Sequence, residues 1–176
     1  MFYINKMIVT LSSRSNVNAG GDAINAQSAQ AYRVQFAKPI LLPIDAEVAL
    51  ISASVNKNTV APGAGSFPLT DDYNSVILRI PELNIRSAQV KDANSNQLLE
   101  QSCIGRPIDV GAARPATAAD GEVGVEVNNP IYQRIYNQDD RYVNELTVEF
   151  IHVDSSPAKE LTLNSEVTIH IRKHGE

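Results

Sequence analysis

The chain has 176 residues, of which 43% are hydrophobic and 20% charged, with a net charge of −5 and one cysteine. This composition excludes a disordered chain, because it supplies enough apolar surface to form a core. The 15 basic residues are scattered, which argues against a dedicated nucleic-acid surface, and a single cysteine excludes an intrachain disulfide.

The first 30 residues are expected to form a strand near residues 3–11, followed by a mobile arm rich in small and polar residues. The apolar run MFYINKMIVTL is interrupted by Lys6. A signal peptide needs a longer apolar core and a cleavage site, and a spanning helix needs about 20 apolar residues. We therefore expect a protein that is neither secreted nor inserted into a membrane.

The next segment, AYRVQFAKPILLPIDAEVALISASVNK (31–57), predicts two strands joined by a corner. KPILLP is expected to form the corner, because Pro39 and Pro43 lack the backbone donor that a strand interior needs. Leu41 and Leu42 are expected to close the end of the core there. Such a corner sends consecutive strands to opposite sheets, as a Greek-key or jelly-roll sandwich requires.

Two predicted strands, near residues 46–56 and 75–81, carry apolar residues on both faces. We expect strands of this kind either to be covered on both faces or to lie in the middle of a sheet and face a partner subunit. The polar stretch VDSSPAKE (153–160) is expected to close a hairpin between the last two strands.

Alternation of apolar and polar residues at period two recurs along the chain, whereas helical periodicity is scarce. The pattern predicts an all-β, two-sheet antiparallel sandwich over residues 31–176, preceded by the N-terminal strand and arm of residues 1–30. Strands are expected near residues 3–11, 31–37, 46–56, 75–81, 83–90, 98–104, 122–127, 131–136, 144–153 and 161–172.

The stretch HVDSSP brings together the residue types of a hydrolase, namely His152, Asp154, Ser155 and Ser156. A catalytic serine usually stands on a nucleophile elbow such as G-x-S-x-G, which the sequence lacks. Asp, Ser and Pro are also common turn formers, and a turn is expected at this point. We therefore assign no catalytic residue, and we expect that the protein is not an enzyme.

Histidines are the first residues to consider as metal ligands, and His170 and His174 are four positions apart, with His152 on a neighbouring strand. Positions four apart on a strand share a face but are separated by about 13 Å, which is too far to hold one ion. The histidines are therefore expected to be polar residues of solvated strands, and no metal ligand is assigned.

The acidic pairs Asp71–Asp72 and Asp139–Asp140 lack the D-x-[DN]-x-[DN]-G pattern of a calcium loop and are expected to be solvated loop charges. Neither a P-loop nor a dinucleotide fingerprint occurs, so no cofactor is expected. Cys103, in LLEQSCIG, is expected to be a small buried apolar residue.

Three segments carry a family resemblance: YRVQFAKPILLPIDAEVALISASV (32–55), SVILRIPELNIRS (75–87) and NELTVEFIHVDSSPAKELTLNSEVTIHIRK (144–173). The first is a strand, a proline corner and a second strand. The second is a strand that runs into Ile-Pro-Glu-Leu, and the third is a closing pair of long strands. In this order they resemble the single jelly-roll capsid proteins, including the penton or vertex proteins, of large icosahedral double-stranded DNA viruses and their virophage and polinton-like relatives.

This resemblance implies a single jelly roll of eight core strands, arranged as two four-stranded antiparallel sheets. It implies a penton subunit that forms a homopentamer at the five-fold positions of a capsid. The expected partners are further copies of the chain, the neighbouring major capsid protein capsomers and minor capsid proteins. The expected location is the virion, assembled inside the host cell.

Other functions fit the same sequence character. A minor cement protein of a capsid would look similar, and so would a lectin-like or receptor-binding jelly-roll module. The binding module would place a ligand site in the loops at 59–74 or 111–122. A sandwich-fold polysaccharide hydrolase or lyase would need a cleft of carboxylates and aromatic residues, for which the sequence offers little.

Overall fold

A computed structural model describes residues 6–13, 31–58, 75–85, 88–91, 98–109, 120–152, 157–158, 161 and 165–175. The elements in chain order are β1 (Lys6–Ser12), β2 (Ala31–Leu42), β3 (Ala46–Asn58), β4 (Ser75–Arg79), the 3₁₀ turn η3 (Pro81–Leu83), β5 (Ala88–Lys91), β6 (Leu98–Gln101), β7 (Cys103–Asp109), β8 (Asp120–Glu126), β9 (Gln133–Arg134), β10 (Arg141–Ile151) and β11 (Glu166–Lys173). Within these residues, no helix is long and apolar enough to span a membrane.

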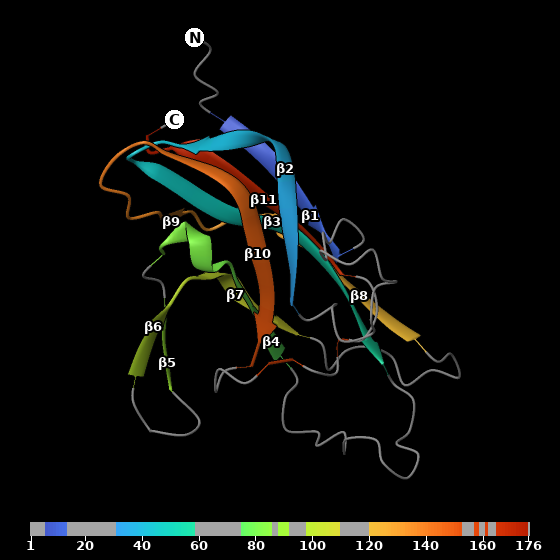
Figure 1. The fold of residues 1–176 in the computed structure, drawn as a ribbon. Coiled ribbons are helices and arrows are strands. Elements are labelled where there is room, and N and C mark those ends of the chain that lie inside the picture. The colour runs from blue at the N-terminus through green and yellow to red at the C-terminus, as the bar shows by residue number, and fades with distance from the viewer. Residues whose placement is uncertain are drawn as a thin grey trace.

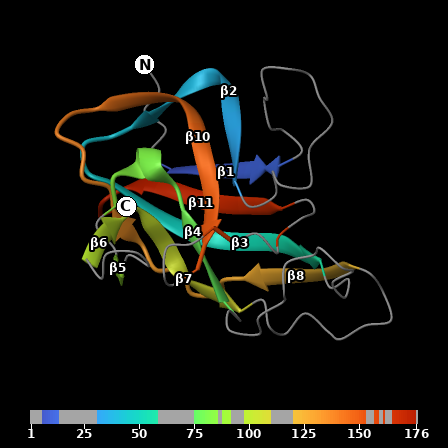
Figure 2. The ribbon, with the colours of Figure 1, turned by 60° about the horizontal axis from the view of Figure 1, so that its bottom comes forward.

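Two antiparallel sheets pack face to face (Figures 1 and 2). The first sheet has the order β1-β11-β3-β8, with β9 also paired to β3, and the second has the order β2-β10-β4-β7. The β5–β6 hairpin forms a separate ladder beside the sandwich (Figure 1). Apart from β4 and β7, which pair within the second sheet, consecutive core strands cross between the sheets in the order of a jelly roll, which confirms the predicted fold class.

The first predicted strand is an edge strand of the first sheet. β1 pairs with β11 along its whole length, from Lys6 opposite Arg172 to Ser12 opposite Glu166. Residues 14–30, where the mobile arm is expected, lie outside the described residues. The division of the chain into residues 1–30 and 31–176 stays a prediction.

The proline corner is shorter than predicted. β2 continues through Pro39 to Leu42, and only the turn after it carries the chain to the other sheet, closed by a bond from the Ala46 N–H to the Pro43 carbonyl. The ladder with β10 shifts register between Gln35 and Ile40, so Pro39 lies in a bulge of an edge strand, where its missing donor is tolerated. The predicted change of sheet is confirmed, with Leu42 in the core and Leu41 half-buried.

A second bulge explains why the sequence of β3 has apolar residues at both odd and even positions. Leu50 pairs with Ile169 and Ser52 with Thr168, so Ile51 is an extra residue in the ladder with β11. The extra residue reverses the alternation, and Leu50 and Ala53 both join the core. β3 and β4 each lie between two other strands, so the strands expected at residues 46–56 and 75–81 are in the middle of a sheet, and whether a partner subunit covers them stays a prediction.

Two predictions about pairing and strand limits are wrong. The last two strands form no hairpin, because β10 belongs to the second sheet and β11 to the first. The single strand predicted at 98–104 is two strands, β6 and β7, which belong to different ladders. β7 continues to Asp109 through a register shift that contains Gly105, whose φ of +74° favours glycine. The glycine and proline of IGRPID therefore mark a bulge and not a loop.

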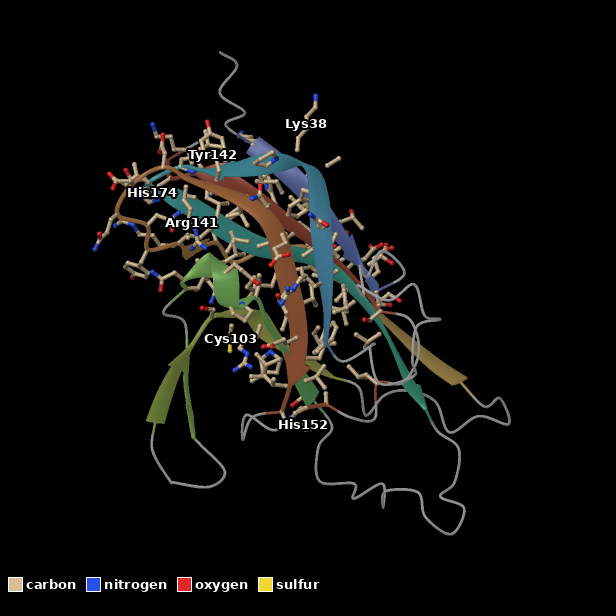
Figure 3. All side chains as sticks on the ribbon, in the orientation of Figure 1. Lys38, Cys103, Arg141, Tyr142, His152 and His174 are labelled. Carbon is tan, nitrogen blue, oxygen red and sulfur yellow. The ribbon has the colours of Figure 1, made fainter. Side chains whose placement is uncertain are left out.

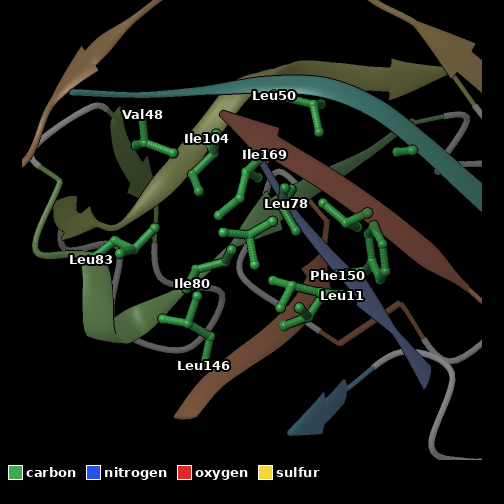
Figure 4. Packing of buried hydrophobic residues seen from close by; sticks show 14 of the residues in the cluster. Leu11, Val48, Leu50, Leu78, Ile80, Leu83, Ile104, Leu146, Phe150 and Ile169 are labelled. Atoms are coloured by element: carbon green, nitrogen blue, oxygen red, sulfur yellow. The ribbon is translucent and has the colours of Figure 1, made fainter. Parts of the chain in front are cut away.

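The core lies between the two sheets and consists mainly of aliphatic side chains (Figure 4). Phe150 is the largest fully buried side chain, and Leu11, Leu50, Leu78 and Ile169 pack in the same cluster. The remaining buried members are Val9, Tyr32, Val34, Leu42, Ala46, Val48, Ala53, Val55, Val76, Ile80, Leu83, Ile85, Ile104, Ile108, Ile135, Val143, Leu146, Val148, Ala158, Leu161, Val167 and Ile171.

A buried hydrogen bond joins the two sheets. The Tyr32 hydroxyl on β2 donates to the Leu11 carbonyl on β1 over 3.0 Å, and burial raises the pKa of Tyr32 well above its usual value. Beside it, Ser13 and Ser165 exchange two bonds: the Ser13 N–H donates to the Ser165 carbonyl, and the Ser165 N–H donates to the Ser13 hydroxyl. This edge of the sandwich is therefore closed by satisfied polar groups.

We expect that Leu50→Asp abolishes folding, because Leu50 is only 3% exposed and its carboxylate replacement would have no partner in the core. Leu50→Ala should cost about 2–5 kcal/mol of unfolding free energy. Chemical denaturation followed by circular dichroism measures both effects. Ile131→Asp is the matched control at an exposed isoleucine outside the strands and should change stability by less than about 0.5 kcal/mol. A Leu50→Asp variant as stable as wild type would contradict the placement of β3.

Candidate functional site

The histidines of the sequence are far apart in the fold. His152 directly follows β10, and His174 follows β11 at the opposite end of the molecule (Figure 3). His170, on β11, shares a hydrogen bond with the Tyr132 hydroxyl, with 2.6 Å between Nδ1 and Oη. In the part of the chain that the structure describes, no three His, Cys, Asp or Glu residues are grouped to hold a metal ion.

The residues of the hydrolase-like stretch are only partly described. His152 is buried, whereas Asp154, Ser155 and Ser156 lie outside the described residues, as do Asp71 and Asp72.

Cys103 lies in a small apolar cluster with Ile77 and Ile151, which faces away from the main core. Burial raises the pKa of its thiol, although the charge of Arg79 partly opposes this effect. The thiol form is therefore favoured near neutral pH, and the predicted burial of Cys103 is confirmed.

The Glu47 carboxylate lies on the outer face of the first sheet and contacts the side chains of Arg172 and His174. Glu47 Oε2 accepts a bond from Arg172 Nε over 3.1 Å, and Glu47 Oε1 lies 2.6 Å from His174 Nδ1. The Arg172 guanidinium also stacks on the Tyr132 ring, 3.4 Å from its centroid. The His174 N–H bonds to the Asp45 carbonyl. These contacts fasten the end of β11 to the start of β3.

The electrostatics of this cluster indicate a structural role. Burial raises the pKa of the Glu47 carboxyl, but the hydrogen bonds and charges of His174 and Arg172 outweigh it and hold the pKa below its ordinary value. Burial and the charges of Arg172 and Lys6 lower the pKa of His170, which favours a neutral imidazole beside the Tyr132 hydroxyl. A fully ionised, paired carboxylate and a neutral histidine are suited to packing and not to proton transfer.

One end of the sandwich carries a hollow of about 870 Å³, which we call the end hollow. Ile44, Tyr136 and Tyr142 stand exposed around it, from the β2–β3 turn, the β9–β10 connection and the start of β10. Tyr142 and Arg141 lie at the upper end of the molecule in Figure 3. The other lining residues are Asp45, Asn84, Arg134, Ile135, Asn137, Gln138, Asp139, Asp140 and Arg141.

Several bonds give the end hollow a fixed shape. Asp140 Oδ1 accepts from the Ile44 N–H over 3.0 Å, so this carboxylate holds the β2–β3 turn. Asn84 Nδ2 donates to the Tyr136 carbonyl over 2.6 Å, and Arg134 pairs with Asp45 over 2.7 Å. Exposed tyrosines beside arginines are enriched at the energetic centres of protein interfaces. The end hollow is therefore suited to binding a partner.

A second depression lies on one flank, where β7 and β8 form neighbouring edges of the two sheets. This flank groove has a volume of about 440 Å³. On the inner side of the groove Gly105 packs closely against Leu50, since a Cβ at position 105 would lie 3.2 Å from Leu50 Cβ. The Gly105 N–H donates to Gln133 Oε1. The groove is lined by Leu50, Gly105, Arg106, Pro107, Ile108, Val125, Glu126, Val127, Asn128, Asn129 and Ile131.

Sequence reasoning missed both surfaces. The segment IYQRIYNQDDRY (131–142) carries three tyrosines with charged and amide residues, and this composition is the signal that could have indicated a binding surface. Its partner residue Ile44 is about 90 positions earlier in the sequence, so only the fold brings them together.

No known protein family and no curated protein matches this sequence. Among solved structures, the fold is similar to the crystal structure of the mavirus penton protein, with a TM-score of 0.59. The match covers 96% of this chain and 99% of that chain, at 6% sequence identity. At this identity the likeness establishes the fold alone.

The Glu47 cluster predicts a pH dependence of stability. Because the folded pKa of Glu47 lies below its unfolded value, the carboxylate stabilises the fold above the ordinary carboxyl value of 4.5. That stability is lost as the pH falls through the folded pKa. Wild type should therefore unfold at a higher temperature than Glu47→Gln at pH 7, and the gap should close in acid.

Thermal unfolding at several pH values measures this gap, with Glu145→Gln as the control. Glu145 pairs with Arg33 at a solvent-exposed site, so its replacement should have a smaller effect, below about 1 kcal/mol. A wild-type and Glu47→Gln gap that is the same at pH 7 and pH 3 would contradict the assigned role.

Proposed function

We propose that this protein is a structural capsid subunit, a penton that closes as a homopentamer at the five-fold positions of an icosahedral shell. The observation that carries the proposal is the end-to-end structural correspondence with the mavirus penton protein, over 96% of one chain and 99% of the other. Neither chain has a large part that lacks a counterpart in the other, as expected for two proteins with the same structural role.

The mechanism of such a subunit is geometric. A five-fold ring uses head-to-tail contacts, in which one patch meets a different patch on the next copy. The sandwich offers patches of this kind on separate sides, namely the flank groove, the end hollow and the outer side of β1, with which no strand of the described residues pairs. The subunit acts by assembly, in the virion, and performs no chemistry.

The end hollow is the surface that we assign to neighbouring capsid proteins, either major capsid protein capsomers or minor capsid proteins. Its exposed Tyr136, Tyr142 and Ile44 supply apolar contact area, and Arg141 supplies a charged donor. The net charge of −5 disfavours direct contact with the packaged nucleic acid. A cement protein between capsomers would use the same surface without forming a ring.

The second candidate function is a receptor-binding module. The same end hollow favours it, because exposed tyrosines beside carboxylates, amides and arginines can also stack on and hydrogen-bond a glycan. The loops at 59–74 and most of 111–122, where the sequence predicts such a ligand site, lie outside the described residues.

The native mass of the purified protein over a concentration series tests the proposal. We expect a pentamer that becomes more populated as the concentration rises. A stable trimer, together with glycan binding that is lost in a Tyr136→Ala and Tyr142→Ala double variant, would contradict the penton and favour the receptor-binding module. A monomer at every concentration would contradict self-assembly of the ring and favour the cement protein.

A further inference from the structure

The motif Ile-Pro-Glu-Leu (80–83) marks the place where β4 stops pairing with β10. β4 ends at Arg79, which pairs with Glu149. Continuing that register would place Pro81 opposite Thr147. Proline suits the start of a turn better than a strand interior, and the chain turns here into η3, the green turn beside β10 in Figures 1 and 2. The Thr147 N–H therefore needs an acceptor other than the backbone of β4.

The Glu82 side chain supplies that acceptor. Its Oε2 accepts a bond from the Thr147 N–H over 3.0 Å, and its Oε1 accepts a bond from the Thr147 hydroxyl over 2.6 Å. Both residues are half-buried. Hydrogen bonds to a carboxylate are stronger than those between neutral groups. The carboxylate thus takes the place of a neighbouring strand at this point of β10.

The backbone of Glu82 contacts the same strand on the other side of a bulge. The ladder between β10 and β2 shifts register between Val143 and Glu145. Thr147 follows this shift and Arg141 precedes it. Arg141 Nη1 donates to the Glu82 carbonyl over 3.2 Å. Glu82 therefore spans the bulge, with its side chain bound on one side and its carbonyl on the other.

The stretch of β10 before the bulge belongs to the end hollow. Arg141 and Tyr142 line the hollow and lie at the upper end of β10 in Figure 3. Residues 141–143 pair with residues 40–42 of β2. A bulge bends a strand and changes the direction of its side chains. A contact that fixes the two sides of the bulge relative to one another also fixes where Arg141 and Tyr142 lie.

Resting on the function proposed above for the end hollow, we propose that Glu82 is its positioning residue. By bracing the bulge, Glu82 holds Arg141 and Tyr142 in the arrangement that a neighbouring capsid protein binds. Asn84, two residues further on, donates to the Tyr136 carbonyl, and the Tyr136 N–H donates to the Asn84 carbonyl over 3.1 Å. The same turn therefore fastens both segments that carry exposed tyrosines. A surface that is fixed before binding loses less conformational entropy when a partner docks.

Four variants test this role. Glu82→Ala removes both bonds to Thr147. Glu82→Gln is the conservative variant, because it keeps one acceptor oxygen and adds an N–H donor that the Thr147 hydroxyl can accept. Thr147→Val removes the hydroxyl bond alone and is a milder second variant. Tyr32→Phe is the matched control, since it removes a buried bond to the Leu11 carbonyl that is not part of the brace.

Hydrogen exchange followed by NMR reports on the brace in the purified protein. Rates at residues 141–143 are compared with those of β11 in the same variant, which report global opening. Glu82→Ala should speed the relative exchange at residues 141–143 by about tenfold, because the strand loses both bonds there. Thr147→Val should have a smaller effect in the same direction, and Glu82→Gln should stay within about threefold of wild type. Exchange in Glu82→Ala no faster than in Tyr32→Phe would overturn the brace.

Binding of purified major capsid protein capsomers, encoded by the same genome, reports on the hollow. Glu82→Ala should weaken this binding by about tenfold, as truncation of an important interface residue does. Glu82→Gln should bind nearly as wild type does. Tyr32→Phe should lower the unfolding temperature and leave the affinity unchanged, so a loss of stability alone does not give the expected result. Equal affinities of Glu82→Ala and wild type would overturn the positioning role.

The two measurements separate this inference from the proposed function. Capsomers that fail to bind the wild-type protein would overturn the assignment of the end hollow to capsomers. Exchange at residues 141–143 would still decide whether Glu82 braces the bulge. Faster exchange in Glu82→Ala with unchanged capsomer binding would overturn the positioning role and leave the proposed function standing.

Discussion

The structure depends on the burial of β3 in the middle of the first sheet. Its inward side chains meet the second sheet along the whole core, and the bulge at Ile51 keeps both Leu50 and Ala53 on that side. Without the extra residue, one half of the strand would turn its apolar side chains to solvent. The same strand carries Glu47, which pairs with Arg172 at the end of β11, and Leu50, which lines the flank groove. A change in the position of β3 would therefore alter both the core and these two surface features.

The described surface is better suited to contact than to reaction. The Glu47 carboxylate is paired, His170 is held by Tyr132, and Cys103 is buried among aliphatic residues. The exposed apolar side chains, in contrast, gather at the end hollow and along the two edges of the first sheet. This distribution fits the mechanism that we propose, in which a rigid sandwich binds further copies of itself and neighbouring proteins.

The sequence was sufficient to predict the sandwich, because period-two alternation survives in strands with one buried face. It misled where a bulge interrupts the pairing at Pro39 and Gly105, since a bulge is defined by the partner strand and not by the strand itself. The end hollow could not be predicted, because Ile44 and Tyr142 line the same hollow only after the β2–β3 turn is placed beside β10.

Electron cryomicroscopy of the purified protein at high concentration tests the central claim, a closed head-to-tail ring of five jelly rolls, most directly. The account predicts a ring with five-fold symmetry in which one surface of each copy meets a different surface of the next. A ring of different symmetry, or two-fold dimers in which the same surface of both copies meets, would contradict it.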